Sequence, residues 1–319
     1  MKIACTGSIA YDYLMSFPGY FKDHILPENL ANISLSFLVD SMVRLRGGTA
    51  PNICYTLALL GEKPLLVGTV GEDFFEYREW LESHGIDTQY VKKIDGVFTA
   101  SFFANTDLSN AQICSFYSGA MKFAADVKIR DIRPVAPELV VISPNDPTAM
   151  DLYVSECVDQ HIPYLYDPGQ QVVRSAPDEL RRGAENAQSL FLNEYEYQLL
   201  KKHTGLTDQH LMNHLEYMVV TRGESGAALY TRDQQFTISV VPPVEIVDPT
   251  GVGDAFRGGF LRGLSLGLDW QTIGQMGALA ATYCLEQRGT QAHHYTIDEF
   301  IQRYRQHFDD GGALDILRN

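Results

Sequence analysis

The segment 248–259 combines a carboxylate, several glycines and the predicted start of a helix. It follows a β-like run, and Phe256, Phe260 and Leu264 recur every four residues, as they do on one face of a helix. The first N–H groups of a helix have no partner within it and carry partial positive charge, so this helix start can hold an anion. Asp254 lies at the predicted anion site, where a carboxylate would take a proton from a group that attacks the anion.

Glycines also occur inside the predicted helix, at Gly258, Gly259 and Gly263. Each costs about 1 kcal/mol relative to Ala in a helix interior. We interpret them as space for the close approach of a neighbouring backbone or a ligand. An ordinary glycine-rich helix cap is the alternative interpretation of the whole segment.

Two other segments carry groups that suit hydroxyl ligands. Residues 2–6 read as a strand, and polar residues near the carboxyl end of a buried strand are where open α/β sheets bind ligands. Asp12 is therefore a candidate for binding hydroxyl groups, with a turn carboxylate as the alternative. Gly47 and Gly48 precede a predicted helix and permit backbone contact with a ligand, while Asn52 offers both a donor and an acceptor to a diol.

The elements that position these groups alternate between strands and helices. Short apolar runs of the kind buried on both faces of a sheet cover 65–70, 139–142, 164–166, 189–192 and 218–220. Helices are expected over 53–60, 74–84, 148–160, 179–187 and 270–287. This alternation predicts a doubly wound, mostly parallel sheet. No Gly-x-Gly-x-x-Gly follows the first strand and no Gly-Lys pair occurs, which argues against a dinucleotide-binding dehydrogenase and a Walker-type phosphate loop.

A small second sheet is expected beside the main one. Residues 33–37 alternate with period two, as a half-buried strand should, and 99–104 and 112–117 are also β-like. We therefore predict a large α/β domain and a small β domain. The large domain comprises 1–12, 47–97 and 119–319, and the small one comprises 13–46 and 98–118.

The composition argues against several classes of partner and indicates the compartment. The net charge of −15 argues against nucleic acid and against an anionic membrane, because both attract clustered Lys and Arg. The five cysteines are far apart and form no Cys-x-x-Cys, which favours reduced thiols in a cytoplasmic protein. No apolar run is close to the length of about 18 residues that a membrane-spanning helix needs. The pair His293-His294 is expected on the surface, and the polar end 309–319 is expected to be loose.

These motifs resemble the signatures of the ribokinase/PfkB family of carbohydrate and nucleoside kinases. Residues 248–254 match Asp-Thr-x-Gly-x-Gly-Asp with Pro249 inserted, and 47–52 match Gly-Gly-x-x-x-Asn. The resemblance extends from Gly7 to about Gly289. It implies a ribokinase-like α/β fold, a doubly wound and mostly parallel sheet flanked by helices, in which the small β-sheet forms a lid over the substrate.

The resemblance also implies ATP-dependent phosphoryl transfer to a hydroxymethyl group. Asp254 would be the general base. The amides around Gly251, Val252 and Gly253 would stabilise charge that grows on the transferred phosphoryl group. The residues expected to bind the substrate are Asp12, Gly47, Gly48 and Asn52.

Two further segments resemble elements that handle nucleotide and metal. Asn193 and Glu196 match Asn-x-x-Glu, which helps to place Mg²⁺ and phosphate; a single Glu suffices because Mg²⁺ asks for one or two carboxylates. A simple helix-start carboxylate is the alternative for Glu196. Nucleotide contacts are expected at Thr221, Arg222, Gly223 and Gly226. Arg222 either reaches a phosphate or is a solvated turn residue.

The sequence leaves three further points open. Small residues within 274–284 would make a slot for adenine or a tight helix contact. Arg257 would assist phosphate binding or pair with a carboxylate. The resemblance leaves open a K⁺ site built from backbone carbonyls near 248–250 and 287–290.

The aromatic character of the predicted lid bears on the acceptor. Unpaired buried polar groups drive the rejection of a wrong ligand, so an apolar wall favours a nucleobase over a sugar. We expect phosphorylation of a purine nucleoside at the 5′-hydroxyl, with adenosine as the main acceptor and inosine or guanosine as additional ones. The alternatives are a sugar kinase of the ribokinase or fructokinase type and a non-catalytic nucleoside or sugar sensor; both a monomer and a homodimer formed through the lid remain open. The lid phenylalanines are Phe17, Phe21, Phe37, Phe102 and Phe116.

Overall fold

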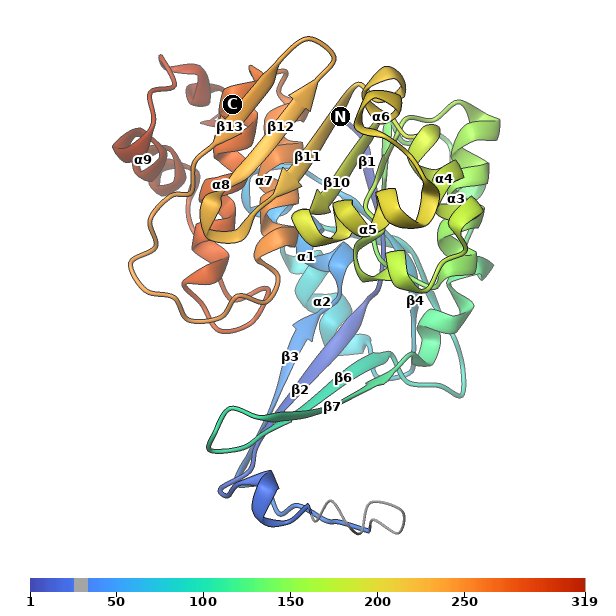
Figure 1. Ribbon diagram of the computed structural model, residues 1–319, viewed down its shortest axis with the longest axis vertical. Helices are drawn as coiled ribbons and strands as arrows, with labels where there is room; N and C mark the ends of the chain where they lie inside the picture. The colour runs from blue at the N-terminus through green and yellow to red at the C-terminus, as the bar shows by residue number, and fades with distance from the viewer. Residues whose placement is uncertain (26–33, 319) are drawn as a thin grey trace.

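The computed structural model describes residues 1–25 and 34–318. Its main body contains a nine-stranded sheet in the order β13-β12-β11-β10-β9-β8-β1-β4-β5 (Figure 1). All neighbouring strands are parallel except β12 and β13, which continue the edge in antiparallel pairs. The strands are β1 Ile3–Thr6, β4 Leu65–Val70, β5 Asp87–Lys93, β8 Leu139–Ile142, β9 Tyr164–Tyr166, β10 Ser189–Asn193, β11 Tyr217–Thr221, β12 Ala227–Thr231 and β13 Gln235–Ile238.

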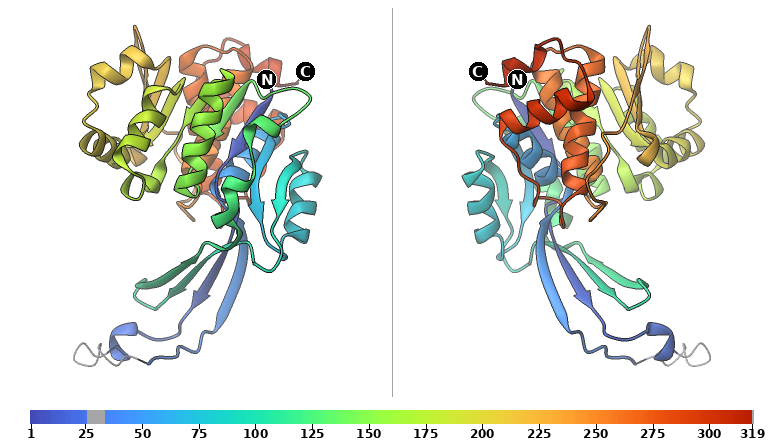
Figure 2. Two further views of the ribbon diagram at one scale, coloured as in Figure 1. Left: turned by 90° about the vertical axis from the view of Figure 1, so that its right-hand side faces the viewer. Right: turned by 90° about the vertical axis from the view of Figure 1, so that its left-hand side faces the viewer.

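Helices cover both faces of this sheet, as the doubly wound prediction requires (Figure 2). Successive residues of a strand point to opposite faces, so Cys5 joins one core while Ala4 joins the other. The first core packs against α1 Thr49–Leu59, α2 Phe75–Ser83, α7 Val252–Ser265 and α8 Trp270–Leu285. The second packs against α3 Pro147–Gln160, α4 Pro177–Glu185, α5 Glu194–Thr204 and α6 Asp208–His214.

The glycines of α7 serve helix packing. A Cβ at Gly258 would lie 2.5 Å from Thr56 of α1, and one at Gly259 would lie 2.6 Å from a backbone oxygen of α8. On the facing helix, a Cβ at Gly277 would lie 2.9 Å from the carbonyl oxygen of Phe256. Backbone approach therefore explains these small residues, and it holds the start of α7 rigidly against the sheet.

The second sheet has four strands in the order β3-β2-β6-β7 and projects away from the main body (Figures 1 and 2). It comprises β2 Ala10–Ser16, β3 Ser41–Gly47, β6 Ala100–Thr106 and β7 Gln112–Tyr117. β2 follows β1 after three residues and pairs along its whole length within this sheet. Asp12 therefore lies in a strand of the smaller sheet rather than in a turn.

The prediction of a strand over 33–37 is wrong for residues 34–37, the part that the structure describes. Residues 34–39 have no regular structure, and residue 33 lies outside the described residues. Phe37 packs edge-to-face against Phe17 and Phe21, with ring centroids 5.1 and 4.9 Å apart, whereas Leu35 is exposed, so this segment is held by aromatic packing and not by strand pairing. The strand in this region is β3, which starts at Ser41. The sequence did not predict it, because polar and charged residues interrupt its apolar pattern.

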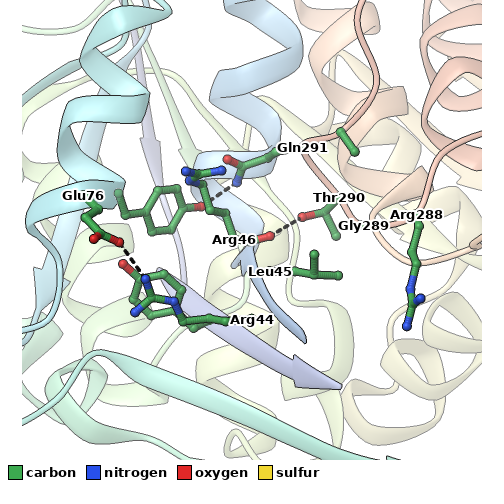
Figure 3. A pocket seen from close by; sticks show the side chains of 11 residues that line it. Arg44, Leu45, Arg46, Glu76, Arg288, Gly289, Thr290 and Gln291 are labelled. Atoms are coloured by element: carbon green, nitrogen blue, oxygen red, sulfur yellow. Dashed lines mark hydrogen bonds and ion pairs between the residues drawn. The ribbon is translucent and has the colours of Figure 1, made fainter. Parts of the chain in front are cut away.

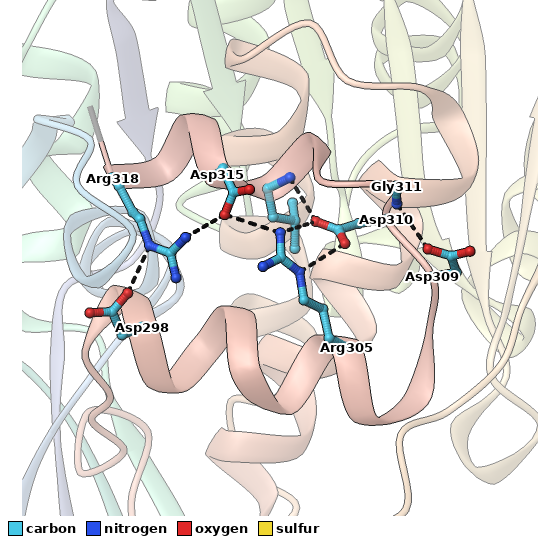
Figure 4. Close-up of polar contacts among 8 residues, drawn as sticks. Asp298, Arg305, Asp309, Asp310, Gly311, Asp315 and Arg318 are labelled. Carbon is cyan, nitrogen blue, oxygen red and sulfur yellow. Dashed lines mark hydrogen bonds and ion pairs between the residues drawn. The ribbon is translucent and has the colours of Figure 1, made fainter.

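The end of the chain is ordered as far as Arg318, the last residue described, contrary to expectation. A 3₁₀ helix over Ala313–Arg318 buries Leu314 and Leu317 in a core shared with α8 and α9 (Ile297–His307). Arg305 pairs with both Asp310 and Asp315, and Arg318 pairs with Asp298 of α9 (Figure 4). The segment is mostly polar and was therefore expected to be loose, but two buried leucines and several ion pairs hold it in place.

The surface prediction for His293 is also wrong. Its side chain is 1% exposed and its Nε2 lies 3.2 Å from the hydroxyl of Thr56, while His294 is exposed. Burial lowers the pKa of His293 to about 4. Within the described residues, no helix has both the length and the apolar character that crossing a membrane would require.

Candidate active site

A cavity of about 260 Å³ lies where the two sheets meet α1 and α7. It gathers residues that the sequence singled out from segments more than 200 positions apart, among them Asp12, Gly48, Asn52, Gly251 and Asp254. Two phenylalanines of the smaller sheet, Phe102 and Phe116, line the same cavity. The remaining lining residues are Ser8, Ala10, Thr49, Gln170, Thr250 and Thr290.

A chain of hydrogen bonds orients the carboxylate at its centre. Asn52 donates from Nδ2 to Oδ2 of Asp254 at 2.8 Å, and Gln291 donates from Nε2 to Oδ1 of Asn52 at 2.9 Å. Gln291 also donates to the hydroxyl of Tyr77, which donates to the carbonyl oxygen of Gly47 at 3.0 Å. This chain leaves Oδ1 of Asp254 available to an incoming hydroxyl group. Nothing in the sequence pattern indicated Gln291 or Tyr77.

The turn before α7 needs its glycine. Gly251 is the N-cap, with φ of 76°, and a Cβ there would lie 2.7 Å from the side chain of Thr290. Val252, Gly253 and Asp254 then form the first turn of the helix, where N–H groups have no partner within the helix. These N–H groups and the positive end of the helix dipole favour an anion beside Asp254.

The loop that precedes this turn is held by one carboxylate. Asp248 accepts a hydrogen bond from the amide of Thr250 at 2.9 Å and another from the amide of Gly289 at 3.0 Å. The segments 248–250 and 287–290, where the sequence left open a K⁺ site, are therefore in contact. The K⁺ site itself stays a prediction.

Glycines also shape the part of the cavity around Asp12. A Cβ at Gly47 would lie 2.5 Å from Oδ2 of Asp12, so only glycine leaves room for that carboxylate. Gly48 has φ of 98° and is the N-cap of α1, the helix that carries Asn52. Gly47 thus makes room for Asp12, and Gly48 starts the helix that carries Asn52.

Two carboxylates with perturbed acidity face the cavity. Burial raises the pKa of Asp254 to about 6; Arg257 and Asn52 oppose the increase, and the charges of Asp12 and Glu196 add to it. Burial, together with the charge of Asp248, raises the pKa of Asp12 to about 6. A carboxylate with a raised pKa is a stronger base, which suits proton transfer near neutral pH.

Arg257 pairs with a carboxylate, which answers one of the questions left open by the sequence. Its Nη2 donates to Oδ1 of Asp167 at 2.9 Å, its Nε lies 2.6 Å from Oδ2, and Nη1 donates to the carbonyl oxygen of Gly253 at 2.9 Å. Asp167 is 2% exposed and follows β9 directly. Arg257 thereby ties the first turn of α7 to the sheet and places a positive charge near Asp254.

The predicted metal and nucleotide residues lie outside this cavity, at the carboxyl ends of β10 and β11. Asn193 pairs in register with Thr221 there. Asn193 and Glu196 form a capping box, in which each side chain accepts a hydrogen bond from the other's backbone amide at 2.8 Å. Glu196 therefore caps a helix, and its charge also raises the pKa of Asp254.

The segment 221–226 forms a tight turn between β11 and β12. Gly226 has φ of 79°, and a Cβ there would lie 2.1 Å from the carbonyl oxygen of Ile238. Arg222 pairs with Glu194 at 3.1 Å on the exposed surface, and Gly223 opens the turn that brings Gly226 back. The structure accounts for these residues by local folding; their contacts with a nucleotide remain a prediction.

The residues present fit a bound Mg²⁺. Mg²⁺ keeps several waters and takes one or two carboxylates plus phosphate oxygens. Glu196 is half-buried and uses only Oε2 in the capping box, while the nearby Asp167 is committed to Arg257. In the described part of the chain, no group of three or more His, Cys, Asp or Glu side chains forms a metal cage. A site completed by nucleotide phosphates is consistent with this arrangement.

Comparison with known proteins identifies the family. The model of the pfkB family carbohydrate kinases matches residues 11–296. A nucleoside kinase from Methanocaldococcus jannaschii is 26% identical over 313 residues, which cover 96% of this chain and 97% of that protein. The structure of Burkholderia thailandensis nucleoside kinase in complex with inosine has a TM-score of 0.86 and 32% identity, covering 96% of this chain and 98% of that one.

A second structure of the Burkholderia thailandensis nucleoside kinase, in complex with ADP-inosine, has a TM-score of 0.83 and 34% identity and covers 96% of both chains. The family model spans most of the present sequence, and the predicted architecture agrees with these structures. The chain therefore belongs to the pfkB family of carbohydrate kinases, has the ribokinase-like fold and is a phosphotransferase that acts on an alcohol group.

Proposed function

We propose that this kinase transfers the γ-phosphate of ATP to the 5′-hydroxyl of a purine nucleoside, with adenosine as the first choice and inosine as a related acceptor. The observation that carries the proposal is the Asn52–Asp254 pair at the start of α7, in a cavity that also holds Asp12 and two phenylalanines. Relatives across nearly the whole length are named nucleoside kinases, and one has been solved with inosine, which supports a nucleoside.

In the proposed reaction, Asp254 takes the proton from the attacking hydroxyl group as that oxygen bonds to the γ-phosphorus and the bond to ADP breaks. The amides of Gly251, Val252 and Gly253 stabilise charge on the transferred phosphoryl group. General-base catalysis contributes about 10²–10⁴-fold in rate. Removal of one preorganised donor costs about 10²–10³-fold. Arg257 donates to the carbonyl oxygen of Gly253 and so helps to hold the first turn of α7, which carries Asp254, in place.

Activity is expected to fall below a pH of about 6. Asp254 acts as a base only when it is ionised, and burial has raised its pKa to about 6, so acidification removes the active form. Asp12 titrates over the same pH range, so the fall of activity towards low pH, the acid limb of the profile, should be steeper than for one group. The measurement is kcat/KM against pH, since this ratio reports groups of the free enzyme. In Asp12→Asn the acid limb should persist with a shallower slope. A value of kcat/KM for the unmodified enzyme that stays constant down to pH 4.5 would contradict the assignment of Asp254 as the base.

Substitution of Glu196 tests its part in metal binding. Mg²⁺, when bound, neutralises the phosphate charges. Glu196→Gln is expected to raise the Mg²⁺ concentration for half-maximal activity by roughly tenfold or more, because losing groups around a metal typically costs 10–100-fold in affinity. Gln at this position keeps the capping box, so the melting temperature should not change. Glu194→Gln, two residues away, is the matched control and should leave the Mg²⁺ requirement as it is.

The aromatic wall favours a nucleoside over a free sugar. Phe116 is 50% exposed and lies opposite Phe102 on the paired strands β6 and β7, so a planar base can replace water against both rings. Stacking of a base on an aromatic side chain contributes about 1–3 kcal/mol. Phe102→Ala and Phe116→Ala are therefore each expected to raise KM for adenosine by about tenfold. A sugar kinase would show no such change, because its acceptor carries no base.

The decisive experiment is a panel of acceptors with labelled ATP. Adenosine, inosine, guanosine and cytidine are compared with ribose and fructose, and product formation is followed by chromatography. We expect transfer to adenosine and inosine. Transfer to ribose or fructose alone would favour the sugar kinase, and binding of a nucleoside without any transfer would favour the sensor. Sedimentation velocity separates the monomer from the homodimer, both of which remain predictions.

A further inference from the structure

The active-site cavity contains a glutamine that takes no part in the hydrogen bonds around Asp254. Gln170 lines the cavity and lies in a 3₁₀ helix over Gly169–Val173, which follows β9. Its side chain is exposed, and within residues 1–25 and 34–318 its amide makes no hydrogen bond. Both a donor and an acceptor of this side chain therefore remain available to a ligand.

The backbone at Gln170 is held on both sides. Gly169 has φ of 48°, and a Cβ there would lie 2.4 Å from the ring of Pro144, so the turn packs directly on the loop after β8. On the other side, Val172 is buried, and its carbonyl oxygen lies 3.0 Å from Nδ1 of His203. A side chain on a turn held in this way is placed accurately enough to select between ligands.

The second carboxamide of the cavity is not available to a ligand in the same way. Asn52 uses Nδ2 for Asp254 and Oδ1 for Gln291. Thr290, which also lines the cavity, donates from its hydroxyl to the carbonyl oxygen of Arg46 at 3.0 Å (Figure 3). Of the two carboxamides that line the cavity, the glutamine after β9 is therefore the one that keeps both its donor and its acceptor.

A base on the aromatic wall turns its edge toward other lining groups. Phe102 and Phe116 come from the projecting sheet, whereas Gln170 comes from the main body. Enzymes that stack a base on aromatic side chains read it by hydrogen bonds to its Watson–Crick edge. Adenine presents the N6–H donor beside the N1 acceptor there, and hypoxanthine presents the O6 acceptor beside the N1–H donor. A carboxamide matches either pair, because rotation by half a turn exchanges its donor and its acceptor.

We propose that Gln170 is a specificity-determining residue, whose amide binds the Watson–Crick edge of a purine stacked on Phe102 and Phe116. This inference rests on the proposed function and adds what the site selects. Nucleosides of 6-amino and of 6-oxo purines are both acceptors, because two orientations of one amide bind them. Gln170 takes no part in proton or phosphoryl transfer, so its substitution changes the choice of acceptor and not the reaction.

Gln170→Glu tests the amide by removing its donor. A carboxylate only accepts hydrogen bonds, so it meets the acceptor in the edge of adenine or hypoxanthine, whereas guanine offers N1–H and N2–H as two adjacent donors. We expect the ratio of kcat/KM for guanosine to kcat/KM for adenosine to rise about tenfold or more, the usual discrimination of a bidentate contact to a base. Gln234→Glu makes the same charge change at an exposed position of the β12–β13 turn and should leave this ratio as it is.

Gln170→Leu removes both hydrogen-bonding groups from the protein, and purine riboside removes the group at C6 from the ligand. The unmodified enzyme should use adenosine about three- to tenfold better than purine riboside, the usual contribution of one hydrogen bond, and Gln170→Leu should use the two alike. Ratios taken within one protein do not depend on how much of it is folded. Variants that lower kcat/KM equally for every nucleoside, with all ratios unchanged, would refute the proposal and place Gln170 at the sugar or the phosphates.

Dissociation constants keep this test separate from the test of the proposed function. Calorimetric titration with adenosine, guanosine and purine riboside needs no turnover. An enzyme that binds them with the expected ratios and phosphorylates none would refute the proposed function and leave the role of Gln170 standing. Binding ratios that are identical in the unmodified enzyme and in both Gln170 variants would refute that role, whatever the enzyme phosphorylates. An enzyme that binds no nucleoside would refute both.

Discussion

Asp254→Asn is expected to lower kcat by about 10²–10⁴-fold and to change nucleoside affinity little. Asparagine has nearly the same shape, and its Oδ1 can still accept the hydrogen bond from Asn52 at the position of the carboxylate oxygen. What it loses is the ability to take the proton of the acceptor hydroxyl. Single-turnover phosphoryl transfer measures the chemical step, and calorimetry of adenosine binding measures affinity.

A matched control separates this effect from a general loss of structure. Asp269 is also an aspartate at a helix start, where it caps α8 by accepting from the amide of Thr272, and asparagine caps a helix equally well. Asp269→Asn should keep kcat within a factor of two. If Asp254→Asn retained more than a tenth of the native kcat, the proton would have to leave by another route and the proposed mechanism would be wrong.

Arg257→Leu is expected to destabilise the protein by about 3–5 kcal/mol, the usual cost of removing one partner of a buried ion pair. Asp167 would be left buried without its charged partner, and Gly253 would lose a hydrogen bond to its carbonyl oxygen. The measurement is the free energy of unfolding from urea titration. Arg222→Leu, which breaks the exposed pair with Glu194, should cost less than about 1 kcal/mol.

The same substitution is expected to move the acid limb of activity to higher pH. Arg257 lowers the pKa of Asp254, so its removal raises that pKa further and leaves less carboxylate at neutral pH. Replacing both Arg257 and Asp167 with leucine should restore most of the stability, because no buried charge is left without a partner, but it should not restore the acid limb. An acid limb that stays in place in both variants would show that Arg257 acts on folding alone.

The sequence predicted most of the main sheet because its strands are buried on both faces. The runs 65–70, 139–142 and 164–166 coincide with β4, β8 and β9, since a strand covered by helices on both sides is apolar throughout and ends at its first polar residue. β3 does not meet that condition. Most of its residues are exposed to solvent or only half-buried, so Arg44 and Arg46 interrupt any apolar pattern.

The candidate site was predicted where chemistry and local backbone coincide in one short segment. Asp254 and Asn52 each lie within a turn of glycines at a helix start, and that local signal is visible in the chain. Gln291 and Asp167 carry no such signal, because each becomes part of the site through one long-range partner, Asn52 or Arg257. Contacts of that kind depend on the fold and cannot be read from spacing.

The position of Asp12 has a mechanical consequence. This carboxylate belongs to β2 and so to the projecting sheet, whereas Asn52 and Asp254 belong to helices of the main body. A ligand whose hydroxyl groups bind both Asp12 and Asn52 would connect the projecting sheet to the main body, which are otherwise joined at this point by the three residues between β1 and β2. Binding of such a ligand would then be coupled to the angle between the projecting sheet and the main body. An analogue without those hydroxyl groups would bind without fixing that angle.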